Sequence, residues 1–138
     1  MLCYNSGQPV QVTGEPEVAM IAEPRTPRTL SIKAAEGIIR QAGLREDELA
    51  NHLGISSKTY SRRIERGTLE PAESMQVEMI ERSLHLATEL LGDSNRARTY
   101  LHTPLVALEN RSPLQLLTSI AGYERVRDSL YAQAYGMF

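Results

Sequence analysis

The chain has 138 residues, 41% hydrophobic but only 5% aromatic, which is enough for one domain or two very small ones with an aliphatic core. Its net charge of −2 is unevenly spread, because residues 25–67 carry nine basic and five acidic residues while the segments on either side are net negative. The lone Cys3 excludes an intrachain disulfide, and no apolar run approaches the roughly 20 residues of a membrane span, so we expect a soluble cytoplasmic protein without a membrane partner.

Residues 1–29 have the composition of a loop or linker. Four prolines (Pro9, Pro16, Pro24 and Pro27) interrupt this stretch, and its longest apolar run is the short "EVAMIA" at 17–22. We predict a flexible or partner-docking N-terminal segment.

Residues 30–70 predict a helix-turn-helix DNA-binding domain. A first helix within 30–44 has apolar residues at helical spacing, with Ser31 as its N-cap. A short second helix over 45–54 begins with acidic residues and ends at Gly54. A third follows at 57–66, capped by Ser56 or Ser57 and stopped by Gly67. The helix-turn-helix motif has this order: a helix, a short turn that contains glycine, and a second helix.

One face of the helix 57–66 is basic. At 100° per residue, Lys58, Ser61, Arg62 and Arg66 point outward together, whereas Tyr60 and Ile64 point inward with Ile55. Arg63 lies near the buried edge, where it either meets DNA or braces the fold. The alternative is a solvated cationic face on a helical bundle. The candidate DNA contacts are Ser57, Lys58, Thr59, Ser61, Arg62, Arg63 and Arg66.

The remainder of the chain also predicts helices, so the expected fold class is all-α. A long connecting helix occupies 71–93, opened by Pro71 and closed by Gly92. A C-terminal domain over 94–138 contains short helices at 95–101, 104–109, 112–119 and 123–135, with Ser112 as an N-cap and Gly122 separating the last two.

No residue pattern indicates catalysis. His52, His85 and His102 have no neighbouring set of metal ligands, and no nucleophile elbow or glycine-rich phosphate loop is present. We predict neither enzymatic activity nor a metal or other cofactor.

The chain end "AYGMF" is unusually apolar and aromatic for a soluble protein. Exposed Tyr, Met and Phe side chains suit interface anchors. Terminal apolar residues also often pack back on their own domain, and the residues alone leave both readings open.

Several stretches in one continuous order resemble the Xre/MbcA/ParS family of antitoxins from toxin–antitoxin systems. They are "GLREDELANHLGIS", "KTYSRRIERGTLEPAES", "LATELLGDSNRARTYL", "TPLVALENRSPLQLL" and "GYERVRDSLYAQAYGMF", and together they span about residues 33–138. "ALENRSP" stands where the family usually has Leu-Gly-Gly-x-x-Pro, so we expect this loop to differ in shape.

The resemblance implies a small all-helical antitoxin that silences a RES-type toxin, which consumes NAD or transfers ADP-ribose from it. It also implies that the protein represses its own operon by binding double-stranded operator DNA, and that its C-terminal domain blocks the active site of the toxin. The residues that it assigns to toxin binding are Val126, Arg127, Leu130, Tyr131, Ala134, Tyr135, Gly136, Met137 and Phe138.

Two further expectations concern assembly and the main alternative. Helix-turn-helix proteins pair their recognition helices across two operator half-sites, so we expect a homodimer or a higher homo-oligomer. The alternative function is that of a stand-alone helix-turn-helix repressor with no toxin partner.

Overall fold

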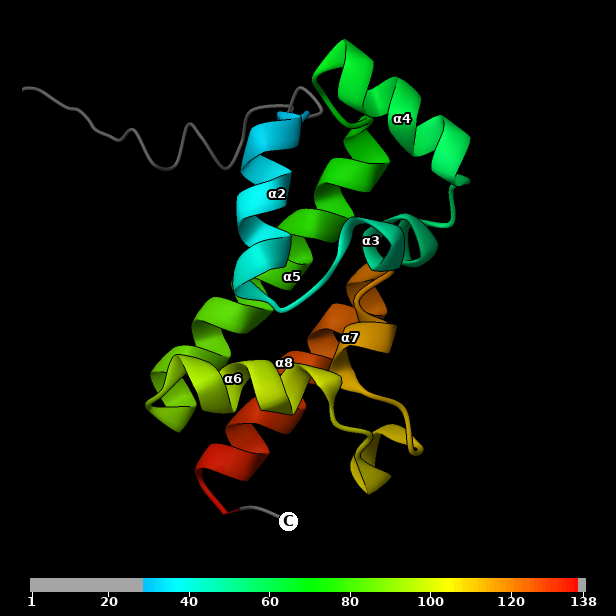
Figure 1. The fold of residues 1–138 in the computed structure, drawn as a ribbon. Coiled ribbons are helices and arrows are strands. Elements are labelled where there is room, and N and C mark those ends of the chain that lie inside the picture. The colour runs from blue at the N-terminus through cyan, green and yellow to red at the C-terminus, as the bar shows by residue number, and fades with distance from the viewer. Residues whose placement is uncertain (1–28, 137–138) are drawn as a thin grey trace, which may run out of the picture.

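The computed structural model describes residues 29–136, so the predicted N-terminal segment lies almost wholly outside the described residues, as do Met137 and Phe138. The predicted all-α class is confirmed for the described part, whose regular elements are helices (Figure 1). These are α2 (Ile32–Gln41), α3 (Glu46–Leu53), α4 (Ser57–Arg66), α5 (Pro71–Leu91), α6 (Ser94–His102), the 3-10 turn η2 (Val106–Leu108), α7 (Pro113–Leu116) and α8 (Ile120–Ala134).

Local signals set most helix ends where the sequence predicts them. Ser31, Ser56 and Ser112 each accept a hydrogen bond from a backbone N–H in the first turn of the helix they precede. Gly54 and Gly67 end α3 and α4 in the left-handed conformation that glycine adopts without strain.

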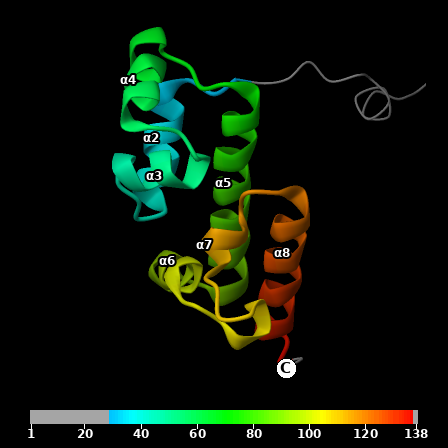
Figure 2. The ribbon, with the colours of Figure 1, turned by 90° about the vertical axis from the view of Figure 1, so that its right-hand side faces the viewer.

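The long helix α5 is the central element of the molecule. In Figures 1 and 2 it runs between the α2–α4 region at one end and the α6–α8 region at the other. It packs against α2 in the first region and against α6 and α8 in the second. Val77, Ile80, Leu84 and Ala87 are at most 8% exposed and belong to one continuous apolar core. The predicted connecting helix is therefore also part of the core of both halves.

Polar contacts join the two halves beside α5. Arg98 and His102 of α6 reach the carbonyl oxygens of residues 41–42 at the end of α2, at 3.2 and 2.8 Å. His52 of α3 contacts the carbonyl oxygen of Leu117 at 2.9 Å. Since a carbonyl oxygen only accepts, the Nε2 atom of each histidine carries the hydrogen. Burial lowers the pKa of His52, although the hydrogen bond to Leu117 acts in the opposite direction. Because its pKa is lowered, the His52 ring is neutral at pH 7.

Three sequence predictions are wrong in detail. The helix expected at 104–109 is only the short turn η2, because Glu109 and Asn110 adopt positive φ angles of 60° and 63°. Ile64, expected to be buried, is 43% exposed. Gly122 does not separate two helices but lies in the first turn of α8, where a Cβ atom would be 1.9 Å from the Leu116 carbonyl oxygen. This close approach, rather than a helix break, requires the glycine.

We predict opposite effects for alanine at two helical glycines. Gly122→Ala should lower the free energy of unfolding by about 2–3 kcal/mol, because the methyl group forces α8 away from the Leu116 carbonyl. Gly37→Ala in α2, where no atom lies within 4 Å of the added Cβ, should raise it by about 0.5–1 kcal/mol. Urea unfolding measures both, and equal effects would contradict the packing argument.

Candidate functional site

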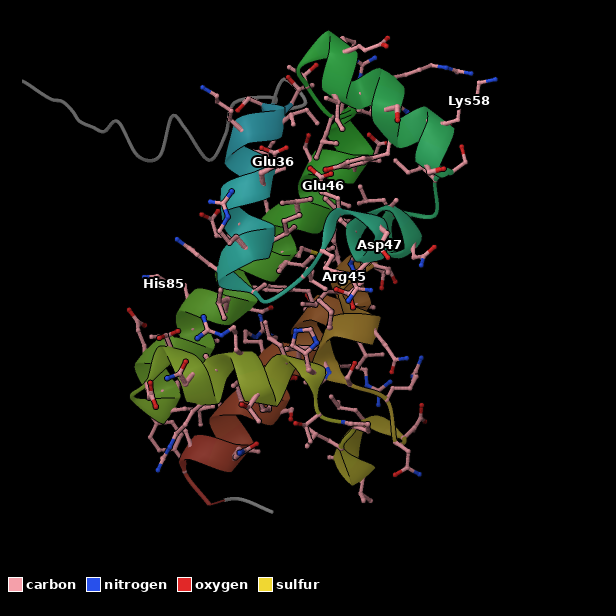
Figure 3. The ribbon with its side chains drawn as sticks, viewed as in Figure 1. Glu36, Arg45, Glu46, Asp47, Lys58 and His85 are labelled. Atoms are coloured by element: carbon pink, nitrogen blue, oxygen red, sulfur yellow. The ribbon has the colours of Figure 1, made fainter. Side chains whose placement is uncertain are left out.

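The basic face of α4 is exposed at the end of the molecule. Figure 1 places α4 beyond the end of α5, and in Figure 3 the Lys58 side chain extends away from the body. Ser57, Lys58, Ser61 and Arg62 are all exposed. Neither Lys58 nor Arg62 has a hydrogen bond or ion pair with another described residue. Both cations are therefore available to an anionic partner.

Two other predicted contacts are engaged locally. Thr59 is half-buried, and its backbone N–H and its hydroxyl each form a hydrogen bond of 3.0 Å with the Oγ atom of Ser56, the N-cap of α4. Arg66 pairs with Glu70 at 3.0 Å and donates to the Thr68 carbonyl at 3.1 Å. The Arg66 side chain is 46% exposed, so its ion pair contributes little to stability and is easily exchanged for a phosphate.

The structure separates Arg63 from the other candidates. Its Nε and Nη2 atoms donate to the two carboxylate oxygens of Glu73, at 2.9 and 3.0 Å, and the two side chains are only 16% and 10% exposed. This bidentate pair ties α4 to the first turn of α5. Of the two roles left open by the sequence, the geometry favours bracing, and we remove Arg63 from the proposed DNA contacts.

Tyr60 attaches the other side of α4 to the domain. It is 5% exposed, and its hydroxyl has no hydrogen-bond partner among the described residues. Burial, with the nearby carboxylates of Glu46 and Glu36, raises the pKa of Tyr60 to about 12, so the phenol is neutral. Figure 3 shows these two glutamates, from α3 and α2, where the three helices meet. A hydrogen bond with Glu36 raises the pKa of Glu46, and burial and the Glu36 charge add to this effect.

At the other end of the molecule the structure corrects the predicted toxin contacts. Val126 and Leu130 are 0% exposed and pack in the core, so they hold α8 in place and offer no surface to a partner. Tyr131 and Tyr135 are exposed, and their rings stack with centroids 6.2 Å apart. Of the remaining described candidates, Gly136 is exposed, while Arg127 and Ala134 are half-buried.

Sequence reasoning missed several residues that position these surfaces. Glu73 is the partner that fixes Arg63, and His52, Arg98 and His102 join the two halves. A glutamate three residues after Glu70 is a local capping signal, and it accepts from the Glu70 backbone N–H at 2.8 Å. No local signal indicates the long-range contacts, whose partners are 57–65 residues apart in the chain.

Two helices joined through Gly54, the second with an exposed cationic face, define a helix-turn-helix protein. Residues 22–87 match the family model described as the antitoxin Xre-like helix-turn-helix domain. Residues 86–136 match the antitoxin Xre/MbcA/ParS C-terminal toxin-binding domain. Over 110 residues the chain is 30% identical to an "Antitoxin Xre" from Yersinia enterocolitica, covering 78% of this chain and 74% of the relative. The chain belongs to the Xre/MbcA/ParS antitoxin family.

Residues 29–136 lack a membrane-spanning helix and a cluster of metal-binding side chains. No helix in this range is long and apolar enough to cross a membrane. The same residues contain no group of three or more His, Cys, Asp or Glu side chains placed to hold a metal ion.

We predict that Arg63 and Arg62 differ in their effect on stability. Arg63→Ala should lower the Tm, because Glu73 loses its partner in a largely buried place, whereas Arg62→Ala should leave the Tm within about 2 °C. Thermal melts followed by circular dichroism measure both. Equal Tm values would contradict the bracing role.

The ion pair between Arg63 and Glu73 also makes the stability of the fold depend on pH. Burial raises the pKa of Glu73, but hydrogen bonds from Arg63 and the Glu70 backbone, with the charges of Arg63 and Arg66, outweigh it and leave the pKa below the ordinary 4.5. The pair therefore stabilises the fold fully above pH 4.5, and this contribution is lost as the pH falls through the lower pKa of the folded state. Arg63→Ala should flatten the decline of the Tm as the pH falls below 4.5.

Proposed function

We propose that this antitoxin neutralises a RES-type, NAD-consuming toxin in the cytoplasm by covering the active site of that toxin with its C-terminal end, and that it represses its own operon through α4. One observation carries the DNA-binding part of this proposal: the exposed cations Lys58 and Arg62, neither of which has an ion-pair partner among the described residues, lie on α4. This helix falls within the residues that match a helix-turn-helix family model. The toxin half is supported by the match of residues 86–136 to a toxin-binding domain.

The proposed DNA interface is the outer face of α4. Its first turn carries Ser57 and Lys58, which suit contact with base edges, and Ser61, Arg62 and Arg66 follow along the same side, which suits phosphate contact. We propose that two copies bind adjacent half-sites as a homodimer, because one recognition helix reads only a few base pairs.

The proposed toxin interface is the exposed end of α8. The stacked Tyr131 and Tyr135 rings supply rigid apolar area at low entropic cost, as suits the anchors of a protein interface. In Figures 1 and 2 this end of α8 and helix α4 are at opposite ends of the molecule. A toxin held there leaves α4 open, which supports repression by the antitoxin with or without its toxin.

For DNA binding we expect the double substitution of Lys58→Ala with Arg62→Ala to weaken operator binding at least about ten-fold. It should also reduce the slope of log K against log salt by about 2, because the homodimer loses the Arg62 phosphate contact in each of its two copies and each contact is worth roughly 0.9. Fluorescence anisotropy with operon promoter DNA at several salt concentrations measures this. Arg82→Ala with Arg96→Ala is the matched control, since it removes two exposed charges from α5 and α6. An equal loss in the control would refute the assignment to α4.

For toxin inhibition we expect a chain ending at Ala134 to lose most of its ability to inhibit. This truncation keeps all of α8 and the buried Val126 and Leu130, so the fold and DNA binding should be retained. The measurement is NAD consumption by the tagged product of the adjacent reading frame, with each antitoxin titrated in. Inhibition by the full chain should weaken as NAD is raised, because an antitoxin covering the active site competes with the substrate.

Co-purification with the tagged product, together with the NAD assay, tests the alternative function of a stand-alone repressor. If no neighbouring gene product co-purifies with the full chain and none consumes NAD, the toxin half of the proposal fails. DNA binding by α4 would then remain as the function.

A further inference from the structure

We propose that the turn around η2, residues 105–111, is a second toxin contact of this antitoxin, with Val106 as the apolar residue that inserts into the partner. This inference rests on the proposed toxin-binding function and extends it to a surface 20 residues or more before the end of α8 in the chain. Val106 is 87% exposed, more than any other large apolar side chain of the described residues. A single exposed valine is common in proteins, but the backbone that carries Val106 is unusually constrained.

The backbone around Val106 is fixed by hydrogen bonds. The Leu105 N–H donates to the Arg111 carbonyl at 3.2 Å and the Asn110 N–H donates to the Leu105 carbonyl at 2.8 Å, which closes the turn at its base. Inside the turn, the Glu109 N–H donates to the Val106 carbonyl at 3.0 Å. The Leu108 side chain is 2% exposed and anchors the turn in the core. Val106 is therefore presented in a defined position.

The turn also holds an unfavourable backbone conformation. Glu109 and Asn110 have successive φ angles of 60° and 63°, and glutamate, unlike asparagine, rarely adopts this region. The Glu109 carboxylate pairs with Arg111 at 2.9 Å and lies 3.7 Å from Arg125 of α8, and the buried Leu108 side chain holds the turn on the core. Such strain persists where the surroundings enforce it, and it concentrates at functional surfaces.

The base of the turn borders a hollow in the toxin-binding half. This hollow has a volume of about 480 Å³ and is lined by Leu105 from the turn, Gln133 from the end of α8, Tyr100 of α6, and Thr103, which follows α6. Figures 1 and 2 both show η2 and the end of α8 at the same end of the molecule, opposite α4. The turn lies within residues 86–136, which match the toxin-binding domain. A toxin segment entering this hollow would touch the turn on one side and α8 on the other. We therefore assign the hollow to a segment of the toxin.

The test is toxin affinity of the full chain carrying Val106→Asp, measured against the same tagged product of the adjacent reading frame. We expect binding at least about ten-fold weaker, and a smaller loss for Val106→Ala, because a charge in a desolvated contact costs more than a lost methyl pair. The Tm and the affinity for operator DNA should stay at the wild-type values, since the side chain is exposed and α4 is remote. Ile120→Asp, at a position 59% exposed in the first turn of α8, is the matched control and should bind toxin normally.

The outcomes separate this inference from the proposed function. Wild-type binding by Val106→Asp would overturn the inference while leaving the proposed function intact, because the wild-type chain still binds. Equal losses in Val106→Asp and Ile120→Asp would overturn it as a general effect of added charge. If Val106→Asp instead changes the size of the free antitoxin on gel filtration and leaves toxin binding unchanged, the turn is a contact between copies of this chain. Absence of binding by the wild-type chain would overturn both.

Discussion

The burial of α5 on both of its sides is the constraint on which the rest of the structure depends. Val77 and Ile80 lie in the core with 0% exposure, and α2 packs against this helix from one half of the molecule while α6 and α8 pack against it from the other. The two family models, for the helix-turn-helix domain and for the toxin-binding domain, meet at residues 86–87, which lie within α5. The helix-turn-helix and the toxin-binding half therefore share one core, and loss of α5 packing removes the support of both surfaces at once.

The first turn of α5 has a second consequence, because it sets the position of α4. Glu73 accepts both from the backbone N–H that caps α5 and from the guanidinium of Arg63. One carboxylate thus connects the start of α5 to α4, and the buried Tyr60 of the same helix lies near Glu36 of α2 and Glu46 of α3. With α4 held on both sides, the placement of Lys58 and Arg62 requires no contribution from the DNA, which lowers the entropy lost on binding.

The difference between what the sequence predicts and what it does not follows from the range of the interactions. Serine caps and left-handed glycines act within a few residues, so the ends of α3 and α4 are predictable. Whether an apolar side chain faces its own core or a partner is a long-range property. Periodicity therefore places Ile64 inside, although it is 43% exposed, and the resemblance assigns contacts to Val126 and Leu130, which are fully buried. The role of Gly122 depends on the carbonyl of Leu116, which no local pattern indicates.

The two proposed binding surfaces of this antitoxin differ in the physical basis of their affinity. The α4 face offers exposed cations, whose attraction to phosphates weakens steeply as salt rises because bound counterions are released on association. The proposed toxin surfaces offer Val106, Tyr131 and Tyr135, and burial of such apolar area is insensitive to moderate salt. If both proposed surfaces are used, a rise in ionic strength releases operator DNA before it releases toxin, and neutralisation is the more robust of the two activities. The opposite order would require the toxin contact to depend on charge, for example on the pairs of Glu109 with Arg111 and Arg125.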